Sequence, residues 1–258
     1  MNRLAEAFES RPIFMPYFPL GYPDLDTSIE IIEALAKEGA DVIEVGLSFS
    51  DPLADGPVIQ HATQVALRNG ITVQASMLAL RELRRRGVTI PLVLMGYYNP
   101  LLSYGLERFV HTARQEGADG FIIPDLPMEE AGEFEPLTGD LPLIRMLAPT
   151  TTDDRMEAIA RPAKGFIYLV SVTGTTGVRA SVFEGLGDLI TRVRAYTTIP
   201  VCVGFGIGTP EQAREVGAMA DGVIVGSACV RAIGESPDPV VAAGRFAASF
   251  KEALRMRV

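Results

Sequence analysis

Three acidic residues stand where an apolar segment of the chain meets a loop rich in glycine and proline. Glu44 lies inside the apolar run 41–45 (DVIEV), and Asp51 and Asp55 lie on the loop that follows. A carboxylate in an apolar strand is costly unless it has a partner or a chemical role. Asp55 comes eleven residues after Glu44, so its side chain can return to face it. Two carboxyls in different environments can take opposite roles, and we therefore predict proton transfer at this pair.

Each of these acids also has a structural interpretation. Glu44 could be a structural acid paired with a basic or hydroxyl group. Asp55 precedes Gly56 and Pro57, so it could cap a helix that begins near Pro57. Asp51 precedes a proline, which is more typical of a turn than of a catalyst. A functional role for Asp51 would be contact with a neighbouring loop or with a partner chain.

Glycine-rich segments follow the last three expected strands. They are 174–177 (GTTG), 204–208 (GFGIG) and 226–227 (GS), and the last opens a short helix expected over 228–232. Glycine lets backbone N–H groups approach phosphate oxygens, and a helix N-terminus adds positive potential. Since barrels hold phosphate at such loops, we predict a phosphate site there. One such segment alone would indicate only a turn.

The residues that the chain lacks also restrict its chemistry. Only three lysines are present, Lys37, Lys164 and Lys251, and none is placed for a Schiff base. The two histidines, His61 and His111, fall on expected helices and suit a surface or capping role. No His/Cys/Asp cluster has the spacing of a metal site. The carboxylates are therefore the main groups left for acid–base chemistry.

Eight short apolar segments alternate with helical segments along the chain. Most are continuous apolar runs, which are typical of strands buried on both faces of a parallel sheet. Eight such units in 258 residues predict an α/β fold, namely a (β/α)8 TIM barrel in a single domain spanning 1–258, with an extra N-terminal helix. The expected strands are 13–18, 42–45, 92–95, 120–123, 143–146, 165–170, 200–203 and 222–225.

A doubly wound open sheet is the alternative architecture. It would more often show a G-x-G-x-x-G turn after the first strand, whereas that turn here is 19–24 (PLGYPD). The expected helices are 25–37, 57–69, 73–86, 105–115, 128–138, 153–160, 183–196, 210–217 and 239–256. Three similar turns, 38–41 (EGAD), 116–119 (EGAD) and 219–222 (MADG), lead from helix to strand. Such turns belong to the face of a barrel that supports stability.

The composition argues against several classes of protein. The net charge is −9 and no basic patch stands out beyond 84–86 (RRR), so nucleic-acid binding is not expected. Cys202 and Cys229 lie in apolar segments, as core residues in a reducing compartment would. The first ten residues lack the apolar segment of a secretory signal, and no apolar run reaches the about 18 residues that span a bilayer. We predict a cytoplasmic protein.

Several stretches resemble one family, the tryptophan synthase alpha chain, and the resemblance covers essentially the whole chain. The most specific are 49–57 (FSDPLADGP), 95–100 (MGYYNP), 124–127 (PDLP), 168–171 (YLVS), 175–177 (TTG) and 204–207 (GFGI). The resemblance implies a (β/α)8-barrel lyase of tryptophan biosynthesis that cleaves indole-3-glycerol phosphate to indole and glyceraldehyde 3-phosphate. It also implies that the chain has no cofactor of its own.

The resemblance also implies roles for single residues. Glu44 matches the general acid/base of the family, Asp55 the aspartate that supports charge at the indole nitrogen, and Tyr168 a tyrosine near the reacting centre. Tyr168 could instead be part of the core. The other matches are the phosphate-binding Gly177, Gly206, Gly226 and Ser227, and the pocket or loop residues Tyr97, Phe205, Asp125 and Thr176. Asp125 could orient Thr176, which we expect to contact Asp55 when the loops close.

The resemblance implies a partner as well. It is a beta chain that binds pyridoxal phosphate, receives indole from the alpha chain, and forms an alpha2beta2 heterotetramer with it. The chain departs from the family at Ser48, where proline is usual. It departs again at 19–23 (PLGYP), where many members have Thr-x-Gly-Asp-Pro. These departures put the communication between subunits in doubt more than the chemistry.

Three alternative functions remain open at this point. The first is a phosphate-binding isomerase on the same scaffold, but it would need an Asp or Cys at the end of strand one, which reads 17–19 (YFP). The second is a non-catalytic subunit that only activates a beta chain, and the intact acid pair argues against it. The third is a free-standing lyase that releases indole without a partner.

Overall fold

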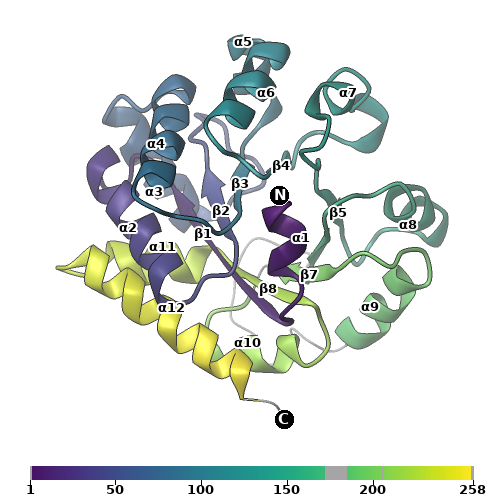
Figure 1. Ribbon diagram of the computed structural model, residues 1–258. Coiled ribbons are helices and arrows are strands. Elements are labelled where there is room, and N and C mark those ends of the chain that lie inside the picture. The colour runs from purple at the N-terminus through teal and green to yellow at the C-terminus, as the bar shows by residue number, and fades with distance from the viewer. Residues whose placement is uncertain (1, 172–184, 205, 257–258) are drawn as a thin grey trace.

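A ring of eight parallel strands forms the centre of the molecule (Figure 1). The computed structural model describes residues 2–171, 185–204 and 206–256. The strands are β1 (Ile13–Pro19), β2 (Ile43–Gly46), β3 (Leu92–Met95), β4 (Gly120–Ile122), β5 (Arg145–Leu147), β6 (Ile167–Val170), β7 (Val201–Gly204) and β8 (Gly222–Val225). Their order is β4-β3-β2-β1-β8-β7-β6-β5, and a bridge between Phe121 and Leu143 joins its two ends. The predicted barrel is confirmed.

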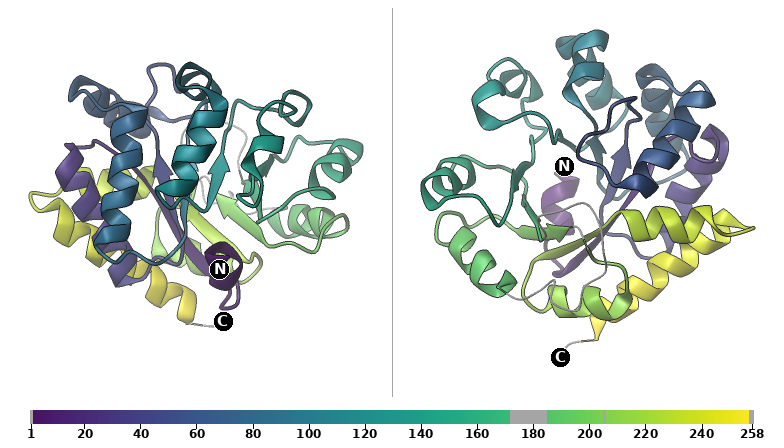
Figure 2. Two further views of the ribbon diagram at one scale, coloured as in Figure 1. Left: turned by 45° about the horizontal axis from the view of Figure 1, so that its top comes forward. Right: turned by 180° about the vertical axis from the view of Figure 1, so that it is seen from behind.

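Helices surround this ring on its outside (Figures 1 and 2). The short helix α1 (Arg3–Ala7) lies at the N-terminal end of the barrel, where the Phe8 ring contacts that of Phe166, and it is the extra helix expected from the sequence. The others are α2 (Leu25–Glu38), α3 (Pro57–Arg68), α4 (Val73–Arg85), α5 (Tyr98–Tyr104), α6 (Leu106–Gln115), η1 (Met128–Glu130), α7 (Glu135–Thr138), α8 (Asp153–Ala160), α9 (Leu186–Arg194), α10 (Pro210–Gly217), α11 (Ser227–Gly234) and α12 (Pro239–Arg255).

Successive residues of each strand face opposite sides of the barrel wall. On β1, Phe14 faces outward and stacks on Phe250 of α12 with ring centroids 5.3 Å apart. Tyr17 lies three residues after Phe14, and because this number is odd, Tyr17 faces inward. It shares this inner face with Glu44 of β2, whose Cα is its partner in the parallel register. The interior of the barrel is thus the place where β1 and β2 can bring polar side chains together.

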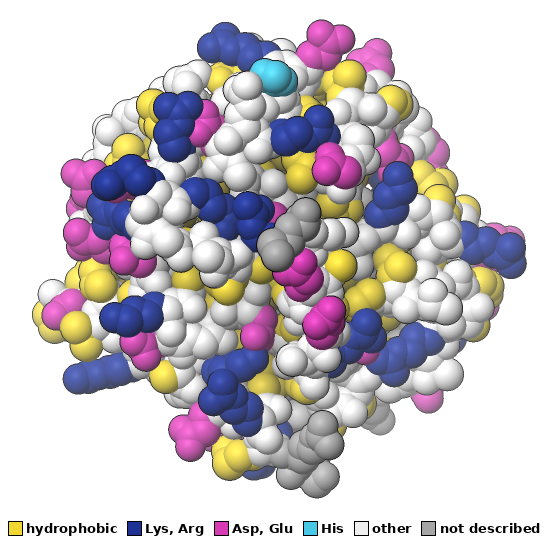
Figure 3. All heavy atoms as spheres, viewed as in Figure 1, with side chains coloured by type: hydrophobic (Ala, Val, Ile, Leu, Met, Phe, Trp, Pro, Cys, Tyr) yellow, Lys and Arg dark blue, Asp and Glu magenta, His cyan; other side chains and the backbone are white. Residues whose placement is uncertain are grey.

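Three aspartates tie neighbouring strands together at the N-terminal end of the barrel. Each stands in one of the three similar helix-to-strand turns, accepts the N–H of a residue in the preceding strand, and pairs with one or two basic side chains. The sets are Asp41 with Phe14 and Lys251, Asp119 with Leu92, Arg84 and Arg3, and Asp221 with Val201, Arg11 and Arg194. Figure 3, from the same side as Figure 1, shows acidic and basic side chains intermixed on this face.

Some boundaries differ from the prediction. The helix expected over 128–138 is wrong, because η1 and α7 are separated by a turn that contains Gly132, a poor helix former. α5 was not expected, and it contains Pro100. Proline is tolerated there since the first turn of a helix leaves its N–H groups unpaired. β5 begins at Arg145, two residues later than expected, because Leu143 forms only the isolated bridge to β4.

Candidate active site

Glu44 lies on the inner wall of the barrel and is almost fully buried. It is 3% exposed, and its Cα partners are Tyr17 on β1 and Val93 on β3. Burial and the nearby charge of Asp55 raise the pKa of Glu44 to about 8. A carboxyl with this pKa holds its proton at neutral pH and can donate it to a bound substrate.

Asp55 is held by the loop that leaves β2. Its N–H donates to the carbonyl of Pro52 at 3.0 Å, and the side chain of Gln60 donates to its carbonyl at 2.8 Å. The hydroxyl of Tyr97 donates to Asp55 Oδ2 at 3.0 Å and accepts the N–H of Ala54 at the same distance. Tyr97 therefore fixes both the carboxylate and the backbone beside it.

The interpretation of Asp55 as a helix cap is wrong. Gly56 occupies the N-cap position of α3 and makes no side-chain hydrogen bond. The Asp55 carboxylate is instead 7% exposed and faces the barrel interior, with Tyr97 as its donor. Burial raises the pKa of Asp55 to about 6, and the hydrogen bond from Tyr97 opposes this rise. At neutral pH the pair therefore keeps one proton on Glu44, while Asp55 is mainly ionised.

Tyr168 lies on β6 across the barrel from these acids. Its hydroxyl occupies the space above Gly204 of β7, where a Cβ would come within 2.5 Å of the phenolic oxygen. Burial, followed by the charges of Glu44 and Asp55, raises the pKa of Tyr168 well above its usual range. Tyr168 is thus a protonated hydroxyl within electrostatic range of both acids, as well as a buried residue of the core.

Tyr17 is a member of this group that the sequence did not reveal. Its phenol is 4% exposed, and burial with the charges of Asp55 and Glu44 raises its pKa well above the usual range. The sequence contained one usable signal, since Met15 and Tyr17 alternate with outward-facing residues on an apolar strand. The alternation alone does not show which residue of the neighbouring strand lies beside Tyr17. That information comes from the register of β1 against β2, which pairs Tyr17 with Glu44.

Two of the predicted phosphate positions meet at the start of α11. Gly226 is its N-cap residue and Ser227 its first residue, and no side chain caps this end. A Cβ at Gly226 would lie 3.5 Å from Ile59 and 3.8 Å from the Cβ of Tyr17, so this helix end stands beside the acid site. Gly206 follows β7, is exposed, and has a positive φ of 74°. Such backbone can present N–H groups to an anion.

The remaining predicted positions lie on the late loops and beside the start of α5. Gly177, Thr176 and Phe205 lie outside the described residues, and so does the expected contact between Thr176 and Asp55. Asp125 is exposed and accepts the N–H of Tyr98 at 2.9 Å, which holds the start of α5. A role for Asp125 toward the late loops therefore stays a prediction.

The two departures from the family pattern lie on the loops that follow β1 and β2. Ser48 Oγ donates to the carbonyl of Leu20 at 3.5 Å and so links the loops after β1 and β2. The ring of Tyr22 contacts Phe18, and its hydroxyl lies where a Cβ of Gly234 would be, 2.3 Å away. Tyr22 thus packs the first loop against the end of α11.

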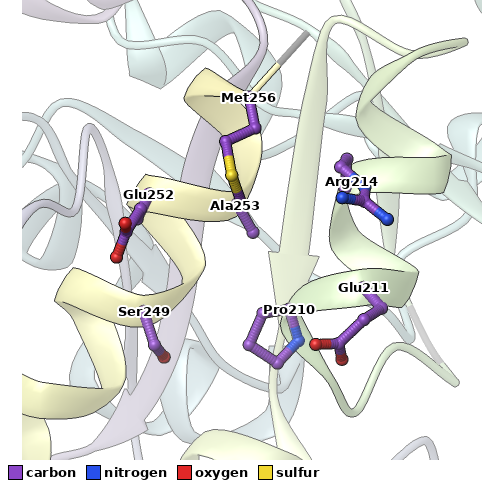
Figure 4. A pocket seen from close by; sticks show the side chains of 7 residues that line it. All are labelled: Pro210, Glu211, Arg214, Ser249, Glu252, Ala253 and Met256. Atoms are coloured by element: carbon purple, nitrogen blue, oxygen red, sulfur yellow. The ribbon is translucent and has the colours of Figure 1, made fainter. Parts of the chain in front are cut away.

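Two surface hollows lie away from this site. Figure 4 shows the first, of about 140 Å³, where Pro210, Glu211 and Arg214 of α10 face Ser249 and Ala253 of α12. A wider hollow of about 620 Å³ runs along α12 and the end of α11. Neither is lined by the acid pair, so both are features of the outer wall.

The described part of the chain offers neither a metal-binding cluster nor a membrane-spanning helix. Within residues 2–171, 185–204 and 206–256, no three His, Cys, Asp or Glu side chains are grouped so that they could hold a metal ion. In the same ranges, no helix is both long and apolar enough to cross a membrane.

A closed parallel barrel with a buried acid pair at the carboxyl ends of its strands is typical of the enzymes of the (β/α)8 class, which carry their active sites at that end. A family model described as "Tryptophan synthase alpha chain" matches residues 4–255. The chain belongs to the tryptophan synthase alpha chain family.

Individual relatives agree with this assignment. The chain is 48% identical to the tryptophan synthase alpha chain of Chloroflexus aggregans over 237 residues, with 89% of each chain covered. It is 46% identical to that of Roseiflexus castenholzii, covering 99% of this chain and 100% of the other. A tryptophan synthase structure from Mycobacterium tuberculosis has a TM-score of 0.91 at 35% identity, with 99% of each chain covered. The structure of the tryptophan synthase alpha subunit from Legionella pneumophila has a TM-score of 0.90 at 36% identity, with 98% of each chain covered.

Membership in this family gives the chain its reaction. It is the alpha subunit of tryptophan synthase in function, a lyase that cleaves indole-3-glycerol phosphate to indole and glyceraldehyde 3-phosphate in tryptophan biosynthesis. The isomerase and non-catalytic alternatives are thereby set aside.

Proposed function

We propose that Glu44 and Asp55 carry out the cleavage as a pair with divided roles. The observation that supports this most strongly is their unequal protonation in one buried site, with pKa values near 8 and 6. An acid and a base are then present together at neutral pH.

Glu44 transfers the protons of the reaction. It donates its proton to C3 of the indole ring, which becomes tetrahedral while positive charge develops on the ring nitrogen. The carboxylate so formed takes the proton of the glycerol hydroxyl as that oxygen becomes the aldehyde. The bond between the ring and the side chain breaks, and its electron pair returns to the ring to give indole. Glu44 ends the cycle protonated, as it began.

Asp55 stabilises the charge that appears at the ring nitrogen. An ionised carboxylate in a water-poor site is most effective when it is already oriented, because no reorganisation is needed during the reaction. Tyr97 supplies this orientation through its hydrogen bond of 3.0 Å to Oδ2. Tyr97 also lines the indole pocket with Phe49, whose ring centroid lies 5.6 Å from its own. Tyr168 bounds the reacting centre from β6.

The phosphate of the substrate binds at the start of α11. The N–H groups of its first turn have no intrahelical partners, and the helix dipole favours an anion there. Gly206, Gly226 and Ser227 provide close backbone approach, together with Gly177 outside the described residues. The nearness of Gly226 to Tyr17 supports a substrate that reaches from the phosphate site to the acid pair.

A beta chain is the proposed partner of this subunit, in an alpha2beta2 assembly, and pyridoxal phosphate belongs to that partner. Leu53 supports this, because it is 88% exposed on the same loop that carries Asp55. Leu102 at the end of α5 is a second large apolar side chain with high exposure. Indole formed in the barrel would pass to the beta chain at this face. We propose further that residues 1–258 form one cytoplasmic domain.

Indole release from indole-3-glycerol phosphate tests these roles. We expect Glu44→Gln to lower kcat by at least about a thousandfold, and Asp55→Asn by at least about a hundredfold, because each removes a group needed in the transition state. Both variants keep the shape of the side chain, so circular dichroism should be unchanged. Cleavage at the rate of the native chain in either variant would contradict the two-acid mechanism.

The same assay separates a coupled subunit from a free-standing lyase. Indole release is measured with and without a beta chain at saturating substrate. A coupled subunit accelerates when the beta chain is added, whereas a free-standing enzyme keeps its rate. A rate of indole release that does not change when the beta chain is added would favour the free-standing alternative.

A further inference from the structure

Tyr97 depends on other residues for its own position in the acid site. Its hydroxyl donates to Asp55 Oδ2 and accepts the N–H of Ala54, both at 3.0 Å. Both bonds require the phenol to be held accurately, because a hydrogen bond weakens steeply when its length or angle departs from the optimum. Tyr97 is the N-cap residue of α5, with extended backbone, in the connection that follows β3. Its backbone therefore needs support from outside that connection.

β4 and the loop that follows it hold the backbone on both sides of Tyr97. The N–H of Gly96, one residue before, donates to the carbonyl of Ile122 at 3.1 Å. The N–H of Tyr98, one residue after, donates to the Asp125 carboxylate, at 2.9 Å to Oδ1 and 3.1 Å to Oδ2. The first bond continues the backbone ladder between β3 and β4, whereas the second is made to a side chain. Asp125 is thus the anchor that a substitution can remove.

The two partners of this second bond are themselves fixed. The N–H of Leu126 donates to the carbonyl of Ile123 at 3.1 Å, which closes a turn around Asp125, and Leu126 is buried. The ring of Tyr98 packs edge-on against the buried ring of Phe134, with centroids 6.3 Å apart. Asp125 also lies at the first N–H of α5, where a helix favours negative charge. The bond therefore joins two anchored segments.

We propose that Asp125 is a positioning residue for the cleavage reaction, in which it keeps the Tyr97 hydroxyl on the Asp55 carboxylate. It does so by holding the N–H of Tyr98 at the start of α5. Asp125 acts through Tyr97 and not on the reacting atoms. Without it, the backbone beside Tyr97 is freer, and the hydroxyl lies on Asp55 for a smaller fraction of the time. This inference rests on the proposed role of Asp55, which is to stabilise charge in the transition state.

The kcat and KM for indole release are the readout, measured on the full chain without a beta chain, so that nothing else holds α5. Asp125→Ala removes the acceptor of the Tyr98 N–H. We expect kcat to fall about three- to tenfold, because the hydrogen bond to the charged Asp55 is weakened. KM should change by less than about twofold, since Asp55 contributes only as charge develops on the ring nitrogen. A higher KM with the native kcat would show a disturbed pocket and would overturn the proposal.

Two variants separate the hydrogen bond of Asp125 from its charge. Asp125→Asn loses the charge but keeps a side-chain oxygen that can accept the N–H of Tyr98, so its kcat should stay within about twofold of the native value. Glu130→Gln is the matched control, because it removes another exposed charge that acts on Tyr98 while the N–H of Tyr98 keeps its acceptor. Its kcat and KM should be native. If Asp125→Asn is as slow as Asp125→Ala, the hydrogen bond is not the cause and the proposal fails.

Tyr97→Phe shows whether Asp125 acts through Tyr97. Alone, it should lower kcat by about tenfold or more, because Asp55 loses its donor. Adding Asp125→Ala to Tyr97→Phe should lower kcat further by less than about 1.5-fold, because the contact that Asp125 supports is already absent. Effects that multiply in the double variant would show that the two residues act independently, which contradicts a positioning role.

The outcomes also separate this inference from the proposed function. If Asp55→Asn cleaves at the native rate, the proposed role of Asp55 fails, and so does any role in positioning it. If Asp55→Asn is slow while Asp125→Ala keeps the native kcat, the proposed function stands and only this inference fails. Assays run well below the lowest melting temperature of the set ensure that a lower rate does not reflect unfolded protein.

Discussion

In the proposed mechanism, Glu44 serves catalysis at the expense of the stability of the folded chain. Its proton is useful because burial makes ionisation difficult, and the same burial makes the folded state resist a charge that water would accept readily. Burial raises the pKa of Asp55 as well, but by less, because the hydrogen bond from Tyr97 stabilises its ionised form.

The free energy of unfolding should therefore depend on pH through Glu44. Its pKa is about 8 in the folded chain against 4.5 in the reference state. The folded state thus keeps a proton that the unfolded state loses, and stability falls as pH rises from about 4.5 to about 8. Glu44→Gln cannot ionise, so its stability relative to the native chain should increase over this range by several kcal/mol, up to about 5 kcal/mol. Denaturant unfolding at both ends of the range measures this difference.

Asp55→Asn provides the comparison for that experiment. Its relative gain should be smaller and complete by about pH 6, since the folded pKa of Asp55 is about 6. If Glu44→Gln gains no stability between the two pH values, the buried carboxyl does not hold its proton in the folded chain.

At the scale of elements, the helix-to-strand turns fix the positions of the strands. Asp119 accepts the N–H of Leu92 at 2.8 Å and pairs with Arg84 and Arg3. Arg84 is largely buried and also donates to the carbonyl of Gly117. The turn therefore links two strands and two helices through one carboxylate.

Loss of this carboxylate should destabilise the chain without changing its chemistry. Asp119→Ala leaves the Leu92 N–H without its acceptor and removes the carboxylate from the Arg84 guanidinium, which then keeps only backbone carbonyls as acceptors. We expect this to cost about 2 to 4 kcal/mol. The kcat for indole release should stay within about twofold at a temperature where the variant is folded. Thermal or denaturant unfolding, paired with the indole assay, tests both statements.

An exposed ion pair gives the matched control for Asp119. Asp140 pairs with Arg114, but 86% of its side chain is exposed. Asp140→Ala should change the free energy of unfolding by less than about 0.5 kcal/mol, because water screens such pairs. Equal losses in the two variants would show that the turn has no special role.

Most of these elements could be predicted from the sequence, and the exceptions have physical causes. Strands buried on both faces are continuous apolar runs, so all eight were found within about two residues of their true ends. The helix at 128–138 was wrong because its hydrophobic pattern concealed the break at Gly132. In the site, Glu44 could be predicted because an acid stands out in an apolar strand, and Asp55 because its loop leaves the end of that same strand. Tyr17 could not be predicted, because its importance depends on register with β2, a contact between strands.

At the scale of the whole molecule, the two ends of the barrel have different tasks. The aspartate turns and α1 occupy the N-terminal end, while the acid pair and the start of α11 lie at the carboxyl ends of the strands. The loop with Leu53 is at this second end, beside Asp55. The proposed chemistry and the proposed docking surface therefore share one face.

Docking of a beta chain should depend on Leu53. Leu53→Glu places a charge where an apolar contact is proposed, and we expect it to reduce activation by a beta chain at least about tenfold. Basal indole release should change by less than about twofold. Leu78→Glu on α4, which is 46% exposed on the outer wall, is the control and should retain activation. Equal activation of both variants would exclude the Leu53 loop from the interface.

The scarcity of lysine has a practical consequence for handling this enzyme. Lys37 lies in the last turn of α2, Lys164 precedes β6, and Lys251 pairs with Asp41, so all three side-chain amines lie at the N-terminal end of the barrel. Lys37 and Lys164 are exposed, whereas Lys251 is held in its ion pair. Coupling through these amines to an amine-reactive bead or sensor chip would attach the molecule by its base. The mouth of the barrel would then face the solution, open to substrate and to a docking protein.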